Sequence, residues 1–156
     1  MIRAGRPEDA EAIAAIWNII IRETSHTFTT AEKDPAALAT QIGQQPYFVA
    51  CEGGAVVGFV TWSQFRAGPG YAHTQEHSIH IARAARGRGL GRALMTRAEA
   101  EAKAMGHHSM IAGVAGENAG GAAFHAAIGY REIARLPQVG WKFGRWHDLV
   151  LMQKIL

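Results

Sequence analysis

Hydrophobic positions near the start of the chain repeat with helical spacing. Between Pro7 and Glu23 apolar residues recur every three to four positions, so their side chains share one side of a helix. The members of this apolar stripe are Ile13, Ile16, Trp17, Ile20 and Ile21. Pro7 followed by two acids favours a helix start, because proline suits the first turn and acids are stabilised at the positive end of the helix dipole. The pattern therefore predicts a helix over residues 7–23 with a buried stripe.

The rest of the chain alternates between short apolar runs, typical of strands, and longer helical patterns, with glycine or proline at many boundaries. A strand candidate, "MIRAG", precedes the first helix, and a second helix follows "KDPAAL" and ends near Gln45. The later segments are strands "YFVACE", "AVVGFVTWSQF" and "HTQEHSIHIA", a helix ending at Gly106, strand "SMIAGVA", helix "ENAGGAAFHAAIG", and strands "YREIARLP" and "HDLVLMQKIL". This order predicts a mixed α/β (α+β) fold in one domain over residues 1–156.

The composition is consistent with that prediction. The 156 residues are 48% hydrophobic, which is enough for one core without a disulfide or a structural metal. The single cysteine, Cys51, lies in an apolar run and is expected to be a buried strand residue, not a nucleophile. No run approaches the ~20 apolar residues that span a bilayer, and "MIRAGRPEDAEAI" carries acids where a signal peptide would be apolar. We therefore expect a cytoplasmic protein with no membrane partner.

Arginines gather around a glycine-rich turn, "RGRGLG", in front of the helix that ends at Gly106. The cluster comprises Arg83, Arg86, Arg88, Arg92 and Arg97. Because the first N–H groups of a helix lack partners and its N-terminus is partly positive, such a turn is a natural anion site. The spacing matches neither G-x-G-x-x-G nor a P-loop, and a tight turn with solvated arginines stays an alternative. No nucleic-acid-binding motif accompanies the formal charge of +3, so nucleic acid is not an expected partner.

The turn also has the form Arg86-x-x-Gly89-x-Gly91, between a strand and a helix in the middle of the chain, and so resembles the acyl-CoA pyrophosphate loop of the GNAT N-acetyltransferase superfamily. Three further segments resemble a narrower group, the phosphinothricin and methionine sulfone or sulfoximine acetyltransferases: "FRAGPGYAHTQEHSIHI", "ENAGGAAFHAAIGY" and "LPQVGWKFGRWHDLVLMQK". The resemblance covers nearly the whole chain. It implies a central sheet of about six to seven strands, flanked by about four helices and splayed at the acyl-CoA strand.

This resemblance implies acetyl-CoA as a co-substrate. Its pyrophosphate is expected on the glycine turn and the helix start, namely Arg86, Gly87, Arg88, Gly89, Leu90, Gly91 and Arg92. Its pantetheine arm is expected along the backbone of Ile79, His80 and Ile81. Asn118 matches the cofactor-contacting asparagine of the family. No metal is expected, because no Cys, Asp or His spacing completes a ligand set with His77 and His80.

Two residues carry the chemistry that the resemblance implies. Glu76 matches the proposed general base, acting on the substrate ammonium directly or through water, and His125 stands where many members have a proton-donating tyrosine. Strand alternation places Glu76 and His77 on opposite faces. We therefore expect the bulge that the family has in this strand, which also frees an N–H for the thioester oxygen. A solvated edge-strand acid for Glu76 and a packing role for His125 stay as alternatives.

The acceptor site follows from the same resemblance. The residues expected to line it are Phe28, Arg66, Ala67, Gly68, Tyr71, Glu76, His77 and Ser78. Four aromatic residues either wall this pocket or bury a subunit interface, namely Tyr71, Trp141, Phe143 and Trp146, and the family favours a homodimer. The expected activity is acetyl transfer to the free amine of a small amino acid or analogue, of the methionine sulfone, methionine sulfoximine or phosphinothricin type. A peptide or protein N-terminal acetyltransferase and a non-catalytic CoA-binding domain are the alternatives.

Overall fold

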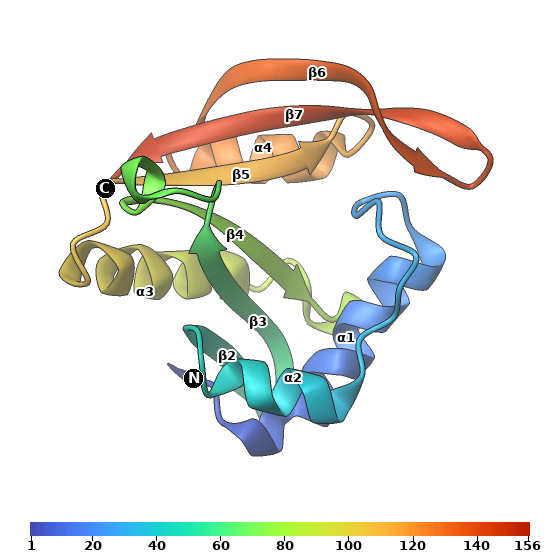
Figure 1. Ribbon diagram of the computed structural model, residues 1–156. Helices are drawn as coiled ribbons and strands as arrows, with labels where there is room; N and C mark the ends of the chain where they lie inside the picture. Colours follow the sequence, from blue (N-terminus) through green and yellow to red (C-terminus); the bar gives the residue numbers. More distant parts are fainter.

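Seven strands form one mixed sheet with helices packed against it (Figure 1). The computed structural model describes residues 1–156, and the strand order is β1-β2-β3-β4-β5-β7-β6. The strands are β1 (Ile2–Ala4), β2 (Tyr47–Glu52), β3 (Ala55–Gln64), β4 (Thr74–Ile81), β5 (Ser109–Ala115), β6 (Arg131–Lys142) and β7 (Arg145–Ile155). The α-helices are α1 (Ala10–Glu23), α2 (Pro35–Ile42), α3 (Leu90–Ala104) and α4 (Ala119–Ala127). The predicted element order and mixed α/β class are confirmed.

Each face of the sheet carries its own apolar core, because strand side chains alternate between the faces. The predicted stripe of α1 is buried, and together with α2 it packs on Val49 and Phe59. On the other face α3 buries Leu94 against a cluster that includes Val60 and Trp62. Cys51 is buried, as predicted. No helix of the fold is long and apolar enough to cross a membrane.

The sheet opens between β4 and β5, which form its one parallel pair. Their pairing stops after His77 and Ala112, although both strands continue beyond these residues. This divergence is the predicted splay. The predicted bulge in β4 is wrong, because the pairing of β3 with β4 runs along the whole of β4 without a shift. The divergence of the strands alone gives both faces of β4 access to the opening.

The C-terminal hairpin is longer than predicted. β6 continues to Lys142, beyond the expected end at Pro137, and β7 begins at Arg145. Pro137 has no N–H to donate, and the register shifts between Leu136 and Gly140, so the strand survives through an irregularity. The sequence prediction ended at the proline because local pattern alone cannot show that pairing resumes. A smaller difference is that α2 ends at Ile42 and not near Gln45.

Candidate active site

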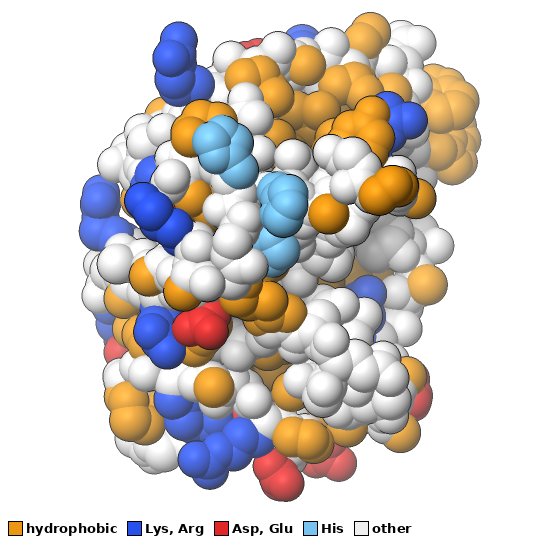
Figure 2. All heavy atoms as spheres, turned by 60° about the vertical axis from the view of Figure 1, so that its left-hand side comes forward, with side chains coloured by type: hydrophobic (Ala, Val, Ile, Leu, Met, Phe, Trp, Pro, Cys, Tyr) orange, Lys and Arg blue, Asp and Glu red, His pale blue; other side chains and the backbone are white.

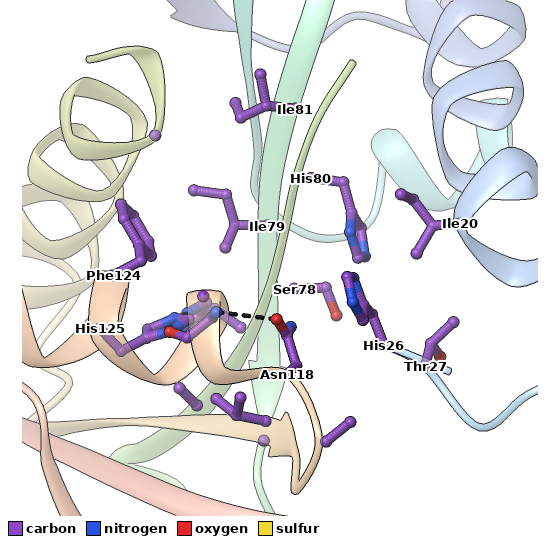
Figure 3. A pocket seen from close by; sticks show the side chains of 18 of the residues that line it. Ile20, His26, Thr27, Ser78, Ile79, His80, Ile81, Asn118, Phe124 and His125 are labelled. Atoms are coloured by element: carbon purple, nitrogen blue, oxygen red, sulfur yellow. Dashed lines mark hydrogen bonds between the residues drawn. The ribbon is translucent and has the colours of Figure 1, made fainter. Parts of the chain in front are cut away.

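A cavity of about 900 Å³ occupies the opening between β4 and β5. Its walls come from the second half of α1, the loop after α1, both strands, the glycine turn with the start of α3, and α4. Side chains from both faces of β4 line it, as Figure 3 shows for Ile79 and His80. The cavity therefore brings together parts of the chain that lie on opposite sides of the sheet.

The glycine turn and the start of α3 form one end of the cavity. Gly87 and Gly89 have φ angles of 76° and 78°, a left-handed conformation that glycine adopts without steric cost. Neither N–H donates to another backbone group, and α3 begins directly afterwards with its own unpaired N–H groups. These donors, together with the positive end of the helix dipole, fit a pyrophosphate group.

The arginines around this turn have different partners. Arg86 and Arg92 line the cavity. Arg88 instead forms an ion pair with Glu52 at 2.8 Å, and Arg97 lies 3.4 Å from a glutamate on its own helix. On the face shown in Figure 2, lysine and arginine side chains likewise lie at several separate places. Only two members of the predicted cluster are thus placed to contact an anion in the cavity.

The backbone of β4 faces the opening at alternate residues. Ala82 N–H donates to Val57 O, so the backbone groups of Ala82 point towards β3. Because the direction alternates along a strand, the backbone groups of His80, two residues earlier, also point towards β3. By the same alternation, those of Ile79 and Ile81 point into the opening. Ile79 therefore offers its N–H and C=O to an extended ligand and Ile81 offers its N–H, since the Ile81 carbonyl oxygen already accepts from Arg86 Nε at 3.1 Å. His80 contributes its side chain.

Glu76 and His80 project from β4 on the side of α1. The Glu76 carboxylate is open to the cavity, and partial desolvation by the surrounding walls raises its pKa. His80 faces His26 of the loop after α1 (Figure 3). Burial lowers the pKa of His80 to about 4 and also lowers that of His26. This side of the cavity therefore combines a carboxylate of increased basicity with two imidazoles that are neutral at neutral pH.

His77 lies on the opposite face and pairs with His125 of α4. Their Nε2 atoms are 2.9 Å apart, and His125 Nδ1 lies 2.8 Å from the carbonyl oxygen of Gly121. Because a carbonyl oxygen only accepts, His125 carries its proton on Nδ1 and His77 donates from Nε2. Burial lowers the pKa of both rings, that of His77 to about 3. The side chain of His77 thus binds His125, and His125 has no N–H free towards the cavity.

Asn118 begins α4 at the edge of the cavity. Its Oδ1 accepts a hydrogen bond from Gly121 N–H at 2.9 Å, drawn as a dashed line in Figure 3. The side-chain oxygen therefore caps the helix. The Nδ2 donor remains for a ligand.

The predicted acceptor residues fall into two groups. Phe28, Glu76, His77 and Ser78 line the cavity. Four predicted residues do not line it: Arg66, Ala67, Gly68 and Tyr71. Sequence reasoning missed His26, Thr27 and Lys33, which line the cavity from the irregular loop after α1, where no periodic pattern indicates direction. No group of three or more His, Cys, Asp and Glu side chains is arranged to hold a metal ion.

Three aromatic side chains at the tip of the β6–β7 hairpin lie outside the cavity. Trp141, Phe143 and Trp146 are each 56% exposed, and the two indole rings meet edge to face with centroids 4.9 Å apart. The expectation that they wall the pocket is therefore wrong. The subunit interface stays a prediction.

Known proteins resemble this chain over most of its length. Residues 13–130 match the Acetyltransferase (GNAT) family. The chain is 39% identical to an L-methionine sulfoximine/L-methionine sulfone acetyltransferase from Salmonella typhimurium, over 90% of this chain and 78% of the relative. It is 31% identical to a phosphinothricin N-acetyltransferase from Streptomyces coelicolor, over 99% of this chain and 95% of the relative. These matches confirm the resemblance found from the sequence motifs.

Solved structures agree with that assignment. A ribosomal-protein-alanine N-acetyltransferase from Brucella melitensis superposes with a TM-score of 0.96 at 36% identity, covering 100% of this chain and 99% of the other. A putative acetyltransferase from Salmonella typhimurium, solved with its cofactor acetyl-CoA, also has a TM-score of 0.96, at 34% identity over 100% of this chain and 93% of the other. Sequence and fold together show that this chain belongs to the GNAT family of acetyltransferases.

Proposed function

We propose that this protein transfers the acetyl group of acetyl-CoA to the free amine of a small amino acid or analogue, of the methionine sulfone, methionine sulfoximine or phosphinothricin type. The observation that carries the proposal is one cavity that joins the glycine turn before α3 to the Glu76 carboxylate. The end at the glycine turn suits a pyrophosphate. At the other end Glu76 can act as a base on the α1 side of β4, where we place the acceptor. The small amino-acid substrates named for the relatives support the choice of acceptor.

This chain's residues hold acetyl-CoA at three places. Donors of the Gly87–Arg92 segment, with the Arg86 guanidinium, bind the pyrophosphate. The backbone of Ile79 and Ile81 pairs with the pantetheine arm, and Asn118 Nδ2 donates from the start of α4. The Arg88 side chain keeps its ion pair with Glu52 and does not bind the cofactor.

Glu76 prepares the acceptor. The acetyl thioester reacts with a neutral amine, so the substrate ammonium first has to lose a proton, and the raised pKa of Glu76 brings this carboxylate closer to the pH at which it works. The proton passes to Glu76 directly or through one water. Ile79 N–H is the first β4 donor beyond the paired segment that faces the opening, and it is placed to stabilise charge on the thioester oxygen.

His125 lies on the α4 wall of the cavity and is our candidate for protonating the leaving sulfur. Its one N–H is bound to Gly121 O, and loss of that proton from the neutral ring would leave an imidazolate. The role therefore requires His125 to carry a second proton before Nδ1–H turns from that carbonyl to the leaving thiolate, so that a neutral imidazole remains. His77 is paired with the other ring nitrogen and orients the ring.

A thiol-release assay with acetyl-CoA tests the function. The panel contains free amino acids, methionine sulfone, methionine sulfoximine, phosphinothricin and short peptides. Turnover confined to the small amines is the expected result. Turnover of peptides alone would favour the N-terminal acetyltransferase that the Brucella neighbour represents. Binding of CoA without turnover of any amine would favour a non-catalytic domain.

We further propose that two copies pair through the exposed aromatic side chains at the tip of the β6–β7 hairpin, because exposed tryptophans are enriched at protein interfaces. Sedimentation equilibrium is expected to give a dimer for the native chain. A monomer at all accessible concentrations would refute this proposal.

A further inference from the structure

The segment "VGWKFGRW", part of one of the three segments that resemble the family subgroup, contributes no residue to the cavity. It forms the tip of the β6–β7 hairpin. In Figure 1 the loop after α1 reaches towards this end of the hairpin. The contacts between the hairpin tip and that loop indicate what the segment does.

Lys142 is a buried cation held by the loop after α1. The residue is 2% exposed, and Nζ donates to the carbonyl oxygens of Thr24 and Thr27 at 2.7 and 2.8 Å. It forms no ion pair with a carboxylate, and desolvation lowers its pKa. A buried ammonium is costly without compensating hydrogen bonds, and here these come from the loop backbone. The side chain of Lys142 therefore fixes the course of residues 24–27.

Phe28 is fixed by a different part of the same hairpin. Its ring lies directly on Gly140, where the Cβ of any larger residue would overlap three ring atoms. The ring also stacks on His147, with centroids 5.5 Å apart, and His147 is the cross-strand neighbour of Gly140. His147 is in turn fixed, because its Nε2 donates to Lys142 O at 2.9 Å. The absence of a side chain at Gly140 thus makes room for Phe28.

A third contact joins the loop to the turn before α4. The Glu117 carboxylate accepts hydrogen bonds from both terminal guanidinium nitrogens of Arg145, each at 2.8 Å. It also accepts a hydrogen bond from the Ser25 hydroxyl. Since Arg145 and Glu117 are solvent-exposed, this pair adds little stability by itself. It does extend the contact to every position from Thr24 to Phe28 except His26, whose side chain is left facing the cavity.

We propose that the hairpin residues Gly140, Lys142 and His147 form a clamp that positions the acceptor wall of the active site. None of the three lines the cavity, but the loop they hold supplies His26, Thr27 and Phe28 to the wall that faces Glu76. We expect the clamp to act on the acceptor and not on acetyl-CoA, because its three residues hold Thr24, Thr27 and Phe28 and not the glycine turn or α3. This inference rests on the proposed function, since it assigns that wall to the acceptor amine.

Lys142→Met tests the clamp by removing the ammonium while keeping a long apolar side chain. With the acceptor that the native protein uses best, we expect the acceptor KM to rise about tenfold or more while the KM for acetyl-CoA stays within about twofold. Hydrogen exchange of the full chain is expected to show faster exchange of the amides of residues 24–28. Lys103→Met, at an exposed lysine on α3, is the matched control and should change neither quantity.

A double-mutant cycle between Gly140 and Phe28 tests the second contact and decides the matter if Lys142→Met does not fold. Gly140→Ala should raise the acceptor KM about tenfold, because the new methyl group displaces the Phe28 ring. In a Phe28→Leu background the same change should have a clearly smaller effect, since the smaller side chain leaves room. Gly43→Ala, at an exposed glycine with an ordinary φ, is the control.

Three outcomes would overturn the clamp. The first is an unchanged acceptor KM in Lys142→Met with unchanged protection of residues 24–28. The second is an equal rise of both KM values, which would mean a general structural defect. The third is equal effects of Gly140→Ala in the two Phe28 backgrounds. If the native protein acetylates no amine, the proposed function fails, but hydrogen exchange still decides whether Lys142 holds the loop.

Discussion

Replacing Glu76 by Gln is the sharpest test of the chemistry, because the structure separates its effect on catalysis from any effect on folding. The carboxylate is open to the cavity, and the only influence on its pKa is desolvation, without a charged or hydrogen-bonding partner. Glutamine has nearly the same size, so stability should change by no more than about 0.5 kcal/mol. The amide cannot accept the ammonium proton. We therefore expect kcat to fall roughly 10² to 10⁴-fold at neutral pH.

The pH dependence gives this prediction a second, independent readout. A general base at Glu76 accepts a proton only when the carboxylate is ionised, so the proposed role predicts that kcat/KM of the native protein falls as the pH drops through its raised pKa. The Glu76→Gln variant cannot remove the ammonium proton, so its rate depends on the fraction of amine that is already neutral in solution. Below the pKa of the substrate amine, its deficit should therefore shrink about tenfold for each unit that the pH rises towards that pKa. Thiol release measured across the pH range, with thermal melting as the folding control, gives both quantities. A near-native rate at neutral pH, or parallel profiles for both proteins, would refute the role of Glu76.

Other changes test the remaining parts of the site and the fold. Gly89→Val forces a β-branched residue into a φ of 78° and should weaken CoA binding at least about tenfold in calorimetry, so native affinity would exclude the glycine turn as the phosphate site. His125→Phe should lower kcat about 10²-fold or more with little change in the acceptor KM, and an unchanged kcat would end its proton-donor role. Asp9 accepts two bonds from Arg3 at 2.7 and 2.8 Å, which lower its pKa, so its contribution is full above about pH 4 and is lost as the pH falls through the lowered value. Asp9→Asn should therefore cost about 1–3 kcal/mol in urea denaturation at neutral pH but little in acid, and an equal cost at both pH values would contradict this assignment.

The features that could be predicted from the sequence are those that depend on neighbouring residues. The α1 stripe follows from helical spacing, and the glycine turn follows from the need for left-handed backbone in front of a helix. The contacts of Lys142 join residues 118 and 115 positions apart, and no local pattern specifies them. The His77–His125 pair likewise spans 48 positions. The predicted bulge in β4 failed for a related reason, because a strand pattern does not show where the neighbouring strand diverges.

The subgroup motif lies at the tip of the β6–β7 hairpin, outside the cavity. This position suggests which residues of such a sequence determine acceptor specificity. The need for glycine at position 140 becomes apparent only from the Phe28 ring that packs on it. The need for lysine at position 142 likewise becomes apparent only from the loop carbonyl groups that its ammonium binds, such as Thr24 O. Residues that contact a substrate can change when the substrate changes. Residues that support the loop after α1 have to fit the side chains and backbone of that loop. A glycine to alanine change at position 140 in a related chain would therefore be expected together with a smaller residue at position 28. Comparing only the cavity-lining residues of two relatives would include Phe28 but miss Gly140, whose lack of a side chain leaves room for the Phe28 ring.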